Sequence, residues 1–253
     1  MHRPRTTIAA GRRIGSHYND AMTPRILSGL FLAATLIGLR PACAQPDLSG
    51  IWMLHGLAKE GELVMTDKAL ALQAEYDLLE DDPSLFCEPA SISRVWANPN
   101  VRIAFEQLAD QVLISYEFFD LRRLVPLGDA SVIADTPSTK NVEGTWFDKM
   151  GSSFAHYAGD RLFIETHAHA PGYIRTSSGV PQTGNTVSVE ELWIEGETLK
   201  LRQTYTDDTL FEKPFVLDYA FRRTGETEMP LYECTDADYD WFEELNAPTD
   251  ETR

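Results

Sequence analysis

The sequence predicts a mainly β protein, either a single antiparallel β-barrel or a strongly curved sheet, with one short helix near the N-terminus. Three observations support this fold class. Runs of strand length with alternating apolar and polar residues follow one another after residue 101. Short turns such as Gly159-Asp160 and Glu195-Gly196-Glu197 separate them. A helical apolar pattern occurs once, over residues 67–80, after the potential cap Thr66.

The N-terminal residues 1–44 are expected to be a signal peptide with an N-terminal extension rather than part of the fold. A short basic stretch precedes an uncharged apolar run over residues 26–39, and Ala42-Cys43-Ala44 matches a cleavage signal. The run is too short for a membrane span. We therefore expect residues 45–253 to form a single barrel domain with an acidic C-terminal tail, located in the periplasm or secreted.

The charge of the chain is strongly negative, at −17 for all 253 residues. Removing residues 1–44 takes away six arginines and one acid, which leaves 16 basic and 38 acidic side chains and a net charge of −22. Such a surface repels phosphate backbones and anionic lipid. We expect no nucleic-acid partner and no membrane span.

Two cysteines, Cys87 and Cys234, remain after cleavage. In an oxidising compartment they can form one disulfide, which ties the region after the first helix to the C-terminal segment. The alternative is two separate buried thiols.

The expected elements follow in chain order. A first strand covers residues 47–54, the helix follows, and residues 84–99 have no regular pattern. The later strands are expected at residues 101–108, 111–119, 121–127, 143–147, 153–157, 162–169, 187–194, 198–206 and 215–223. Residues 170–186 form a loop of small and polar residues, long enough to be a lid.

Gly50-x-Trp52 in the first strand resembles the Gly-x-Trp signature that opens lipocalin-type, or calycin-like, barrels. The resemblance implies that an arginine of the last strand packs over the tryptophan face as a cation–π contact. The last strand ends in Arg222-Arg223 and supplies such an arginine. The simpler interpretation is a core tryptophan.

The strand over residues 162–169 carries the sharpest chemical pattern. Side chains alternate across a strand, so Glu165, His167 and His169 are expected on one face with Phe163, opposite Leu162, Ile164 and Thr166. The pattern does not say which of the two faces is inside. If Glu165, His167 and His169 point into the barrel, we expect an enzyme. If Leu162, Ile164 and Thr166 point into it, we expect a carrier with an apolar pocket.

Several functions suit the face of Glu165, His167 and His169. With Glu191 or His156 as a third ligand it can bind a metal. Without metal, these histidines with Glu165 and Glu191 can perform acid–base catalysis, while Tyr173 and Arg175 on the loop orient a substrate. The alternatives are an ordinary solvated strand face and, for Arg175, a structural ion pair. We expect no metal and no cofactor.

Aromatic residues are abundant in the strand region, and most aromatic residues in proteins belong to the core. A barrel of this size can also hold one small ligand. His156, Trp193 and Tyr205 join Tyr173 and Arg175 as candidates for contacting a small hydrophobic or aromatic molecule. The sequence contains no nucleophile elbow, phosphate loop or dinucleotide fingerprint, so covalent catalysis and nucleotide cofactors are not expected.

Several segments together resemble a large family of exported bacterial proteins of undetermined function. The segments, in chain order, are Ser49-Gly50-x-Trp52, Cys87-x-Pro89, Gly159-Asp160-x-Leu162 with Glu165-Thr166, Gly172-Tyr173-x-Arg175, Gly179-Val180-Pro181, Glu191, Thr206-Asp207-Asp208, Lys213-Pro214-Phe215 and Tyr232-Glu233-Cys234. The resemblance implies export but no activity. His167 and His169 are particular to this chain.

Two functions from different classes follow. The first is an exported, cofactor-independent enzyme, a lyase, isomerase or hydrolase, acting on a small hydrophobic or aromatic molecule through Glu165, His167, His169 and Glu191. The alternative is a non-catalytic binding or carrier protein for such a molecule. A structural role through the acidic surface is a third possibility.

Overall fold

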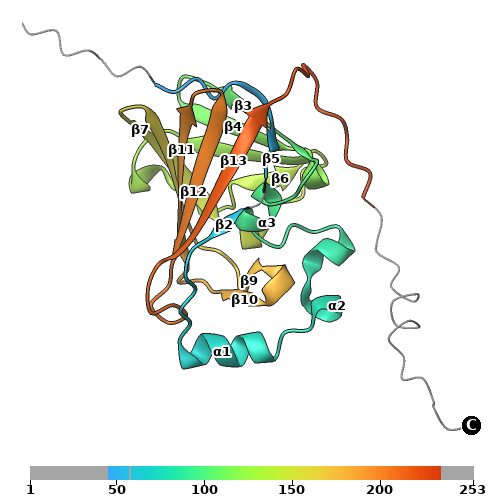
Figure 1. The fold of residues 1–253 in the computed structure, drawn as a ribbon, viewed down its shortest axis with the longest axis vertical. Coiled ribbons are helices and arrows are strands. Elements are labelled where there is room, and N and C mark those ends of the chain that lie inside the picture. Colours follow the sequence, from blue (N-terminus) through green and yellow to red (C-terminus); the bar gives the residue numbers. More distant parts are fainter. Residues whose placement is uncertain (1–44, 57, 235–253) are drawn as a thin grey trace, which may run out of the picture. The chain divides into compact units, whose positions relative to one another are not determined.

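The computed structural model describes residues 45–56 and 58–234 (Figure 1). The expected signal peptide and the last part of the acidic tail, residues 235–253, lie outside this range. Its strands are β1 (Gly50–Leu54), β2 (Lys59–Glu60), β3 (Arg102–Gln107), β4 (Gln111–Tyr116), β5 (Leu121–Pro126), β6 (Thr139–Asn141), β7 (Ser152–Ala158), β8 (Arg161–His167), β9 (Gly172–Arg175), β10 (Val180–Gln182), β11 (Val187–Glu195), β12 (Thr198–Thr206) and β13 (Phe215–Arg223). Its α-helices are α1 (Asp67–Ala74), α2 (Leu78–Asp81) and α3 (Ile92–Trp96). Short 3₁₀ turns occur at Pro83–Phe86, Phe118–Asp120, Ala130–Val132, Asp148–Met150 and Thr176–Ser178.

The strands confirm a mainly β, antiparallel protein. One sheet runs in the order β6-β5-β4-β3-β1-β13-β12-β11-β8-β7, with β2 paired to β13. The ladder is not closed, but its two ends approach each other. The Gly128 amide donates to the Ala155 carbonyl over 2.8 Å, and Leu127 and Ala155 form an isolated parallel bridge. The sheet is therefore a strongly curved one whose interior is enclosed.

Alternation of side chains explains why these segments form strands around one core. In β4, Val112, Ile114 and Tyr116 are fully buried while the residues between them are partly exposed. The same rule holds in β12, where Leu199 and Leu201 point inward. Each strand thus buries one face against the others, which is the main source of stability for such a sheet.

The predicted contact between the first and the last strand is confirmed. The Arg223 guanidinium carbon lies 4.3 Å from the centroid of the Trp52 ring, and the Trp52 indole donates to the Leu48 carbonyl over 2.8 Å. Gly50 has φ +107, and a Cβ there would lie 2.6 Å from Arg223 Nη1. Glycine suits position 50 because its φ is positive and because the Arg223 side chain occupies the space that a Cβ would take.

The helical region differs from the expectation of one helix over residues 67–80. Thr66 caps α1 as predicted, accepting from the Ala69 amide, but the helix ends at Ala74. Asp77 then caps the separate helix α2 through the Leu79 amide. A third helix, α3, lies in the segment expected to be irregular, where Ser91 caps it through the Arg94 amide. Local capping side chains thus divide the region into three short helices.

The lid-like loop is also more ordered than expected. Residues 172–182 form the hairpin β9–β10, which contacts α1 and α3. In Figure 1, α1, α2 and this hairpin lie at one end of the sheet, with α3 between them and the strands. The expected strand over residues 143–147 contributes only the isolated bridge between Lys140 and Trp146.

The disulfide between Cys87 and Cys234 is confirmed, with a Cα–Cα distance of 5.9 Å. It closes a loop with a sequence separation of 147 residues. In the chain-entropy account such a closure stabilises the fold by about 5 kcal/mol. None of the helices in the described ranges has the length and apolarity needed to cross a membrane.

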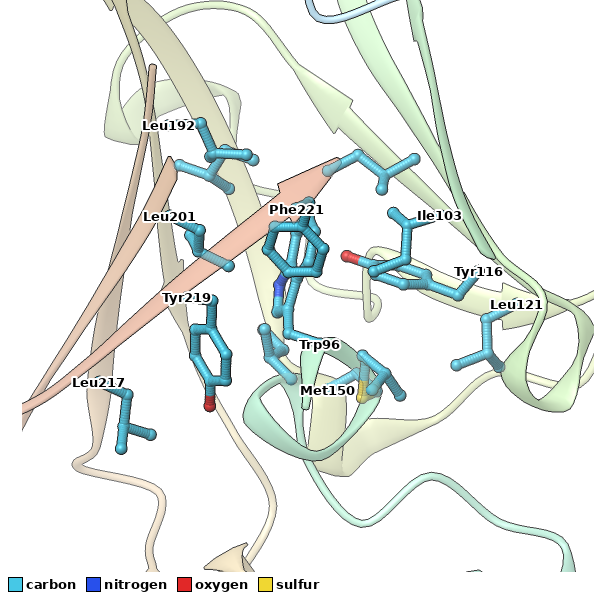
Figure 2. Packing of buried hydrophobic residues seen from close by; sticks show 14 of the residues in the cluster. Trp96, Ile103, Tyr116, Leu121, Met150, Leu192, Leu201, Leu217, Tyr219 and Phe221 are labelled. Atoms are coloured by element: carbon cyan, nitrogen blue, oxygen red, sulfur yellow. The ribbon is translucent and has the colours of Figure 1, made fainter. Parts of the chain in front are cut away.

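The core is centred on Trp96 of α3, which reaches into the enclosed space (Figure 2). Its ring lies 5.3 Å from that of Tyr116 and 5.5 Å from that of Phe221 between ring centroids. Figure 2 shows Leu201 and Tyr219 on one side of it and Ile103 on the other. A helix that the sequence did not predict therefore inserts its tryptophan between the strands.

Candidate binding site inside the sheet

The face of β8 that points inward is the apolar and hydroxyl face. Leu162, Ile164 and Thr166 have no exposure, whereas Glu165 and His167 each keep 35% of their side chains exposed. On the outside, His167 Nε2 and Glu165 Oε1 are 2.6 Å apart. The pair is therefore a surface contact.

His169 does not share the face of Glu165 and His167, which corrects the expectation from alternation. The strand β8 ends at His167, and Ala168 has φ +53, so the chain turns before His169. The His169 side chain enters the protein, and 2% of the residue is exposed. The period of two residues applies only while the backbone stays extended.

The hydrogen bonds of His169 define its tautomer. Nδ1 lies 3.1 Å from the Lys149 carbonyl, which can only accept, so Nδ1 carries the hydrogen. Nε2 then accepts from the Ser188 hydroxyl at 3.4 Å. Burial lowers the pKa of His169 to about 4, and the nearby charges of Arg123 and His167 act in the same direction. The ring is neutral at neutral pH.

Glu191 and Trp193 belong to the outer face of β11. Glu191 Oε1 accepts from Arg161 at 2.5 Å, and the Arg161 guanidinium carbon lies 4.5 Å from the Trp193 ring centroid. His156 on β7 is exposed and stacks on Phe163 with 5.3 Å between ring centroids. These three candidates therefore lie away from the interior.

The weaker metal hypothesis for Glu165, His167 and His169 does not fit the structure. Because His169 turns inward, the three side chains do not converge. Within residues 45–56 and 58–234, no group of three potential ligands is arranged to hold a metal ion.

Tyr173 and Arg175 are placed in the lid-like hairpin. The Tyr173 ring packs on Tyr76 of the α1–α2 linker, 4.4 Å between centroids, and Arg175 Nη1 lies 3.3 Å from Glu60 Oε2. Gln73 of α1 donates to the Ser178 carbonyl over 2.6 Å. These contacts fasten the hairpin to its neighbours, so both residues have structural partners where they stand.

The most unusual feature of the interior is a buried ion pair between Arg123 of β5 and Glu190 of β11. Both side chains have no exposure, and Arg123 Nη2 lies 2.6 Å from Glu190 Oε2. The same guanidinium nitrogen donates to Ser153 over 2.9 Å and to Thr166 over 2.8 Å. Burial acts to lower the pKa of Arg123, but the Glu190 carboxylate outweighs it, and the pKa is raised. The Arg123 guanidinium therefore stays charged.

Sequence reasoning missed Arg123 and Glu190, although the pattern contained a signal. Each occupies an inward position of an alternating strand, Arg123 between Leu121 and Val125 and Glu190 next to Leu192. A lone charge at an inward position is costly unless it finds a partner. Two such positions of opposite charge in one sheet indicate a buried pair.

Beside this pair, β12 places Gln203 and Tyr205 at inward positions, both without exposure. Gln203 lies opposite Glu190 on one side and Leu217 on the other in the strand register. Neither amide atom of Gln203 has a hydrogen-bond partner among the described residues. Burial raises the pKa of the Tyr205 hydroxyl well above its usual value. Tyr205 was a sequence candidate, and Gln203 was not.

The helix α3 covers this part of the interior. Ser93 and Tyr219 are joined by a hydrogen bond of 3.0 Å between their hydroxyl oxygens, and Ser91 donates to the Ile174 carbonyl of β9 over 2.9 Å. The Trp96 indole donates to Glu190 Oε1 over 2.5 Å. The helix is thus fastened both to the sheet and to the hairpin.

Comparison with known proteins places the chain in no family. No protein-family model matches it, and no curated protein matches it. Among solved structures it is similar to a "secretary abundant heat soluble (SAHS) protein" from Ramazzottius varieornatus, with 10% identity, a TM-score of 0.38 and coverage of 72% of this chain and 99% of that chain. It is also similar to the wild-type fluorescent protein UnaG, with 12% identity, a TM-score of 0.35 and coverage of 70% and 96%.

Proposed function

We propose that this protein binds a small molecule inside its curved sheet, beneath α3 and the β9–β10 hairpin. The observation that carries the proposal is Gln203, a fully buried amide with both polar atoms unpartnered within the described residues. Each buried donor or acceptor left without a partner costs about 1–3 kcal/mol. A ligand that forms hydrogen bonds with the Gln203 amide removes this cost.

The placement of the acid–base candidates favours binding over catalysis. Glu165, His167 and Glu191 lie on the outer face, where two of them are paired with each other and the third with Arg161. His169 alone reaches the interior, and both of its nitrogens have partners. Proton-transfer chemistry needs a group with a free site facing the substrate. The lyase, isomerase or hydrolase interpretation therefore has weaker support than the carrier interpretation.

The surroundings of Gln203 suit a ligand that is otherwise hydrophobic or aromatic. Leu201 and Leu217, both without exposure, flank it within the sheet, and Tyr205 follows it on β12. Ligand sites of this kind combine apolar walls with a few fixed polar groups.

We further infer that the chain is an exported, calycin-like barrel protein and a member of the bacterial family that its motifs resemble. The Cys87–Cys234 disulfide supports an oxidising location, the periplasm or the exterior. The contact of Arg223 with Trp52 supports the lipocalin-type architecture.

The test begins with the full chain, purified after export and analysed by native mass spectrometry with solvent extraction. We expect a co-purified small molecule, or one from a library of aromatic compounds, to raise the melting temperature. Gln203→Leu is expected to fold, to lose this response and to be at least as stable as the ligand-free wild type. Gln111→Leu, the same substitution at an outward, half-buried position of β4, serves as the matched control and keeps the response.

The opposite pattern overturns the proposal. If no compound stabilises the protein and Gln203→Leu loses about 1–3 kcal/mol of stability, the amide is satisfied internally and has a structural role.

A further inference from the structure

A groove of about 440 Å³ lies between α1 and the β9–β10 hairpin, at the end of the sheet where Figure 1 shows both elements. Lys68 and Leu72 line it from α1, and because they are four residues apart they lie on the same face of the helix. The opposite wall comes from the hairpin and the residue before it, and consists mainly of Pro171, Tyr173, Pro181 and Gln182. A space of this volume can hold a small organic molecule.

Most of the groove wall is apolar and rigid. Leu72 and the rings of Pro171 and Pro181 form part of it, and the Tyr173 ring is held in place by the Tyr76 ring, 4.4 Å away between centroids. Burial raises the pKa of Tyr173, so its hydroxyl carries no charge at neutral pH. Fixed aromatic and proline rings of this kind suit the flat face of an aromatic ligand.

Lys68 supplies the charge of the groove. Its ammonium group donates to the Thr209 hydroxyl over 3.3 Å and forms no ion pair with a carboxylate of the described residues. Lys149, Lys200 and Lys213, by contrast, each have a carboxylate partner. An ammonium group has three donors, so Lys68 keeps donors for a ligand.

The acid closest to Lys68 through this contact is Asp207, which is itself engaged. Its carboxylate accepts from the hydroxyls of Thr183, Thr186 and Thr209, and the residue is 4% exposed. None of the described residues that line the groove is acidic. The groove therefore has a local positive charge on a chain with a net charge of −17.

Gln182 adds a fixed polar group to the groove. The residue is 2% exposed, and its Nε2 donates to the carbonyls of Lys149 and Ala170, over 3.0 Å each. Its Oε1 has no hydrogen-bond partner among the described residues. A residue that lines the groove thus keeps an unused acceptor, as is typical of a wall that combines apolar surface with a few fixed polar groups.

We propose that this groove binds a small aromatic carboxylate, with its ring against Tyr173 and the two prolines and its carboxylate on Lys68. The negative charge of the rest of the surface acts weakly here, because it is screened over about 8 Å at physiological ionic strength. The groove is separate from the interior of the sheet, and the inference does not depend on the binding function proposed above.

The test compares 2-naphthoate with 2-naphthamide, which has the same shape without the charge, and with acetate, which has the charge without the ring. The full chain is titrated with each probe by ¹H–¹⁵N NMR, and the amides of Leu72 and Gly172 report on the groove. We expect 2-naphthoate to bind about fivefold more tightly than 2-naphthamide, the effect of a partly exposed ion pair. Acetate is expected to bind at least tenfold more weakly than 2-naphthoate.

Three variants separate charge from packing. Lys68→Met keeps the length of the side chain and is expected to reduce the ratio of the naphthoate and naphthamide affinities to about one. Lys59→Met, at an exposed position of β2 outside the groove, is the matched control and retains the ratio. Leu72→Ala removes apolar wall and is expected to weaken both naphthalene probes by a similar factor, about threefold.

Several results would overturn the proposal. Equal affinities of 2-naphthoate and 2-naphthamide in the wild type would show that Lys68 does not recognise the carboxylate, and so would equal effects of Lys68→Met and Lys59→Met. Unperturbed amides of Leu72 and Gly172 would show that the groove is empty. Gln203→Leu is expected to leave the affinity for 2-naphthoate unchanged, and a loss of binding in that variant would place the probe in the interior of the sheet instead.

Discussion

The indole nitrogen of Trp96 donates a hydrogen bond of 2.5 Å to Oε1 of Glu190, and both residues are fully buried. The bond joins α3 to β11 across the interior of the sheet. Glu190 holds Arg123 of β5 with its other oxygen. A helix and two strands that are not neighbours in the sheet are therefore connected through one carboxylate.

This relationship predicts that Trp96→Phe destabilises the protein by about 2–4 kcal/mol. The phenyl ring keeps much of the packing with Tyr116 and Phe221 but leaves a charged acceptor without its donor. Urea denaturation followed by circular dichroism measures the change. Trp146→Phe is the control, because Trp146 is 44% exposed and its loss is expected to change stability by less than about 0.5 kcal/mol. Equal effects of the two substitutions would contradict the role of the bond.

The buried ion pair gives a second prediction. Arg123→Met is expected to lower stability by about 3–5 kcal/mol, because Glu190 is then buried without its countercharge. Adding Glu190→Met is expected to recover part of the loss, since an apolar pair needs no compensation. The double-mutant cycle measures the coupling.

The control for this cycle is the exposed pair of Arg202 and Asp218, with 2.7 Å between Nε and Oδ1 and with 48% and 31% of the side chains exposed. Solvent screens that pair, so Arg202→Met is expected to cost less than about 1 kcal/mol. A small effect of Arg123→Met, no larger than that of Arg202→Met, would show that the interior pair is not desolvated.

His169 predicts a loss of stability in mild acid. Its pKa is lowered from 6.5 to about 4 in the folded protein, mainly by burial. The unfolded chain therefore binds a proton that the folded protein excludes, and stability falls as the pH drops from about 6.5 towards 4. The full effect is about 3 kcal/mol, at about 1.4 kcal/mol per pKa unit.

Urea midpoints between pH 7 and pH 4 measure this slope. His169→Gln is expected to flatten it over that window, whereas His156→Gln is the control, because His156 is exposed and keeps contact with solvent. An unchanged slope in His169→Gln would assign the acid sensitivity to other groups.

Gly50 predicts a substitution that disturbs the contact between the first and last strands. An alanine there meets Arg223 Nη1 at 2.6 Å and also adopts φ +107. We expect Gly50→Ala to cost about 3 kcal/mol and to shift the fluorescence of Trp52 as Arg223 leaves its ring. Gly196→Ala has positive φ as well, but its Cβ meets no atom within 4 Å, so it is expected to cost about 1 kcal/mol. Equal losses of stability in Gly50→Ala and Gly196→Ala would show that the Arg223 side chain moves away from the added Cβ without cost.

Much of the local structure was predictable from the sequence. Alternation placed Val112, Ile114 and Tyr116 on one buried face, and Thr66 capped the first helix where expected. Gly50, Trp52 and Arg223 came together as the Gly-x-Trp pattern indicated. The pairing of Cys87 with Cys234 followed from their number and from the expected compartment. The strand faces and the helix cap depend on residues that are close together in the chain. The disulfide was predictable because each cysteine had one possible partner.

The site was not predictable in the same way. Alternation separated Glu165 and His167 from Ile164 and Thr166, but only the curvature of the whole sheet decided that the second group is inside. A single residue of positive φ, Ala168, then turned His169 away from the other two. A pattern of period two describes faces and says nothing about which face the rest of the chain will cover.

The sequence by itself determined an antiparallel sheet, its approximate strands, its disulfide and its acidic surface, because these follow from composition and local periodicity. Only the tertiary structure decided that Arg123 meets Glu190, that Trp96 enters the sheet and that Gln203 lies beside them. These residues are far apart in the chain, and their contacts depend on the curvature of the whole sheet. The arrangement of the interior polar groups, and with it the proposed ligand site, is therefore a property of the folded sheet.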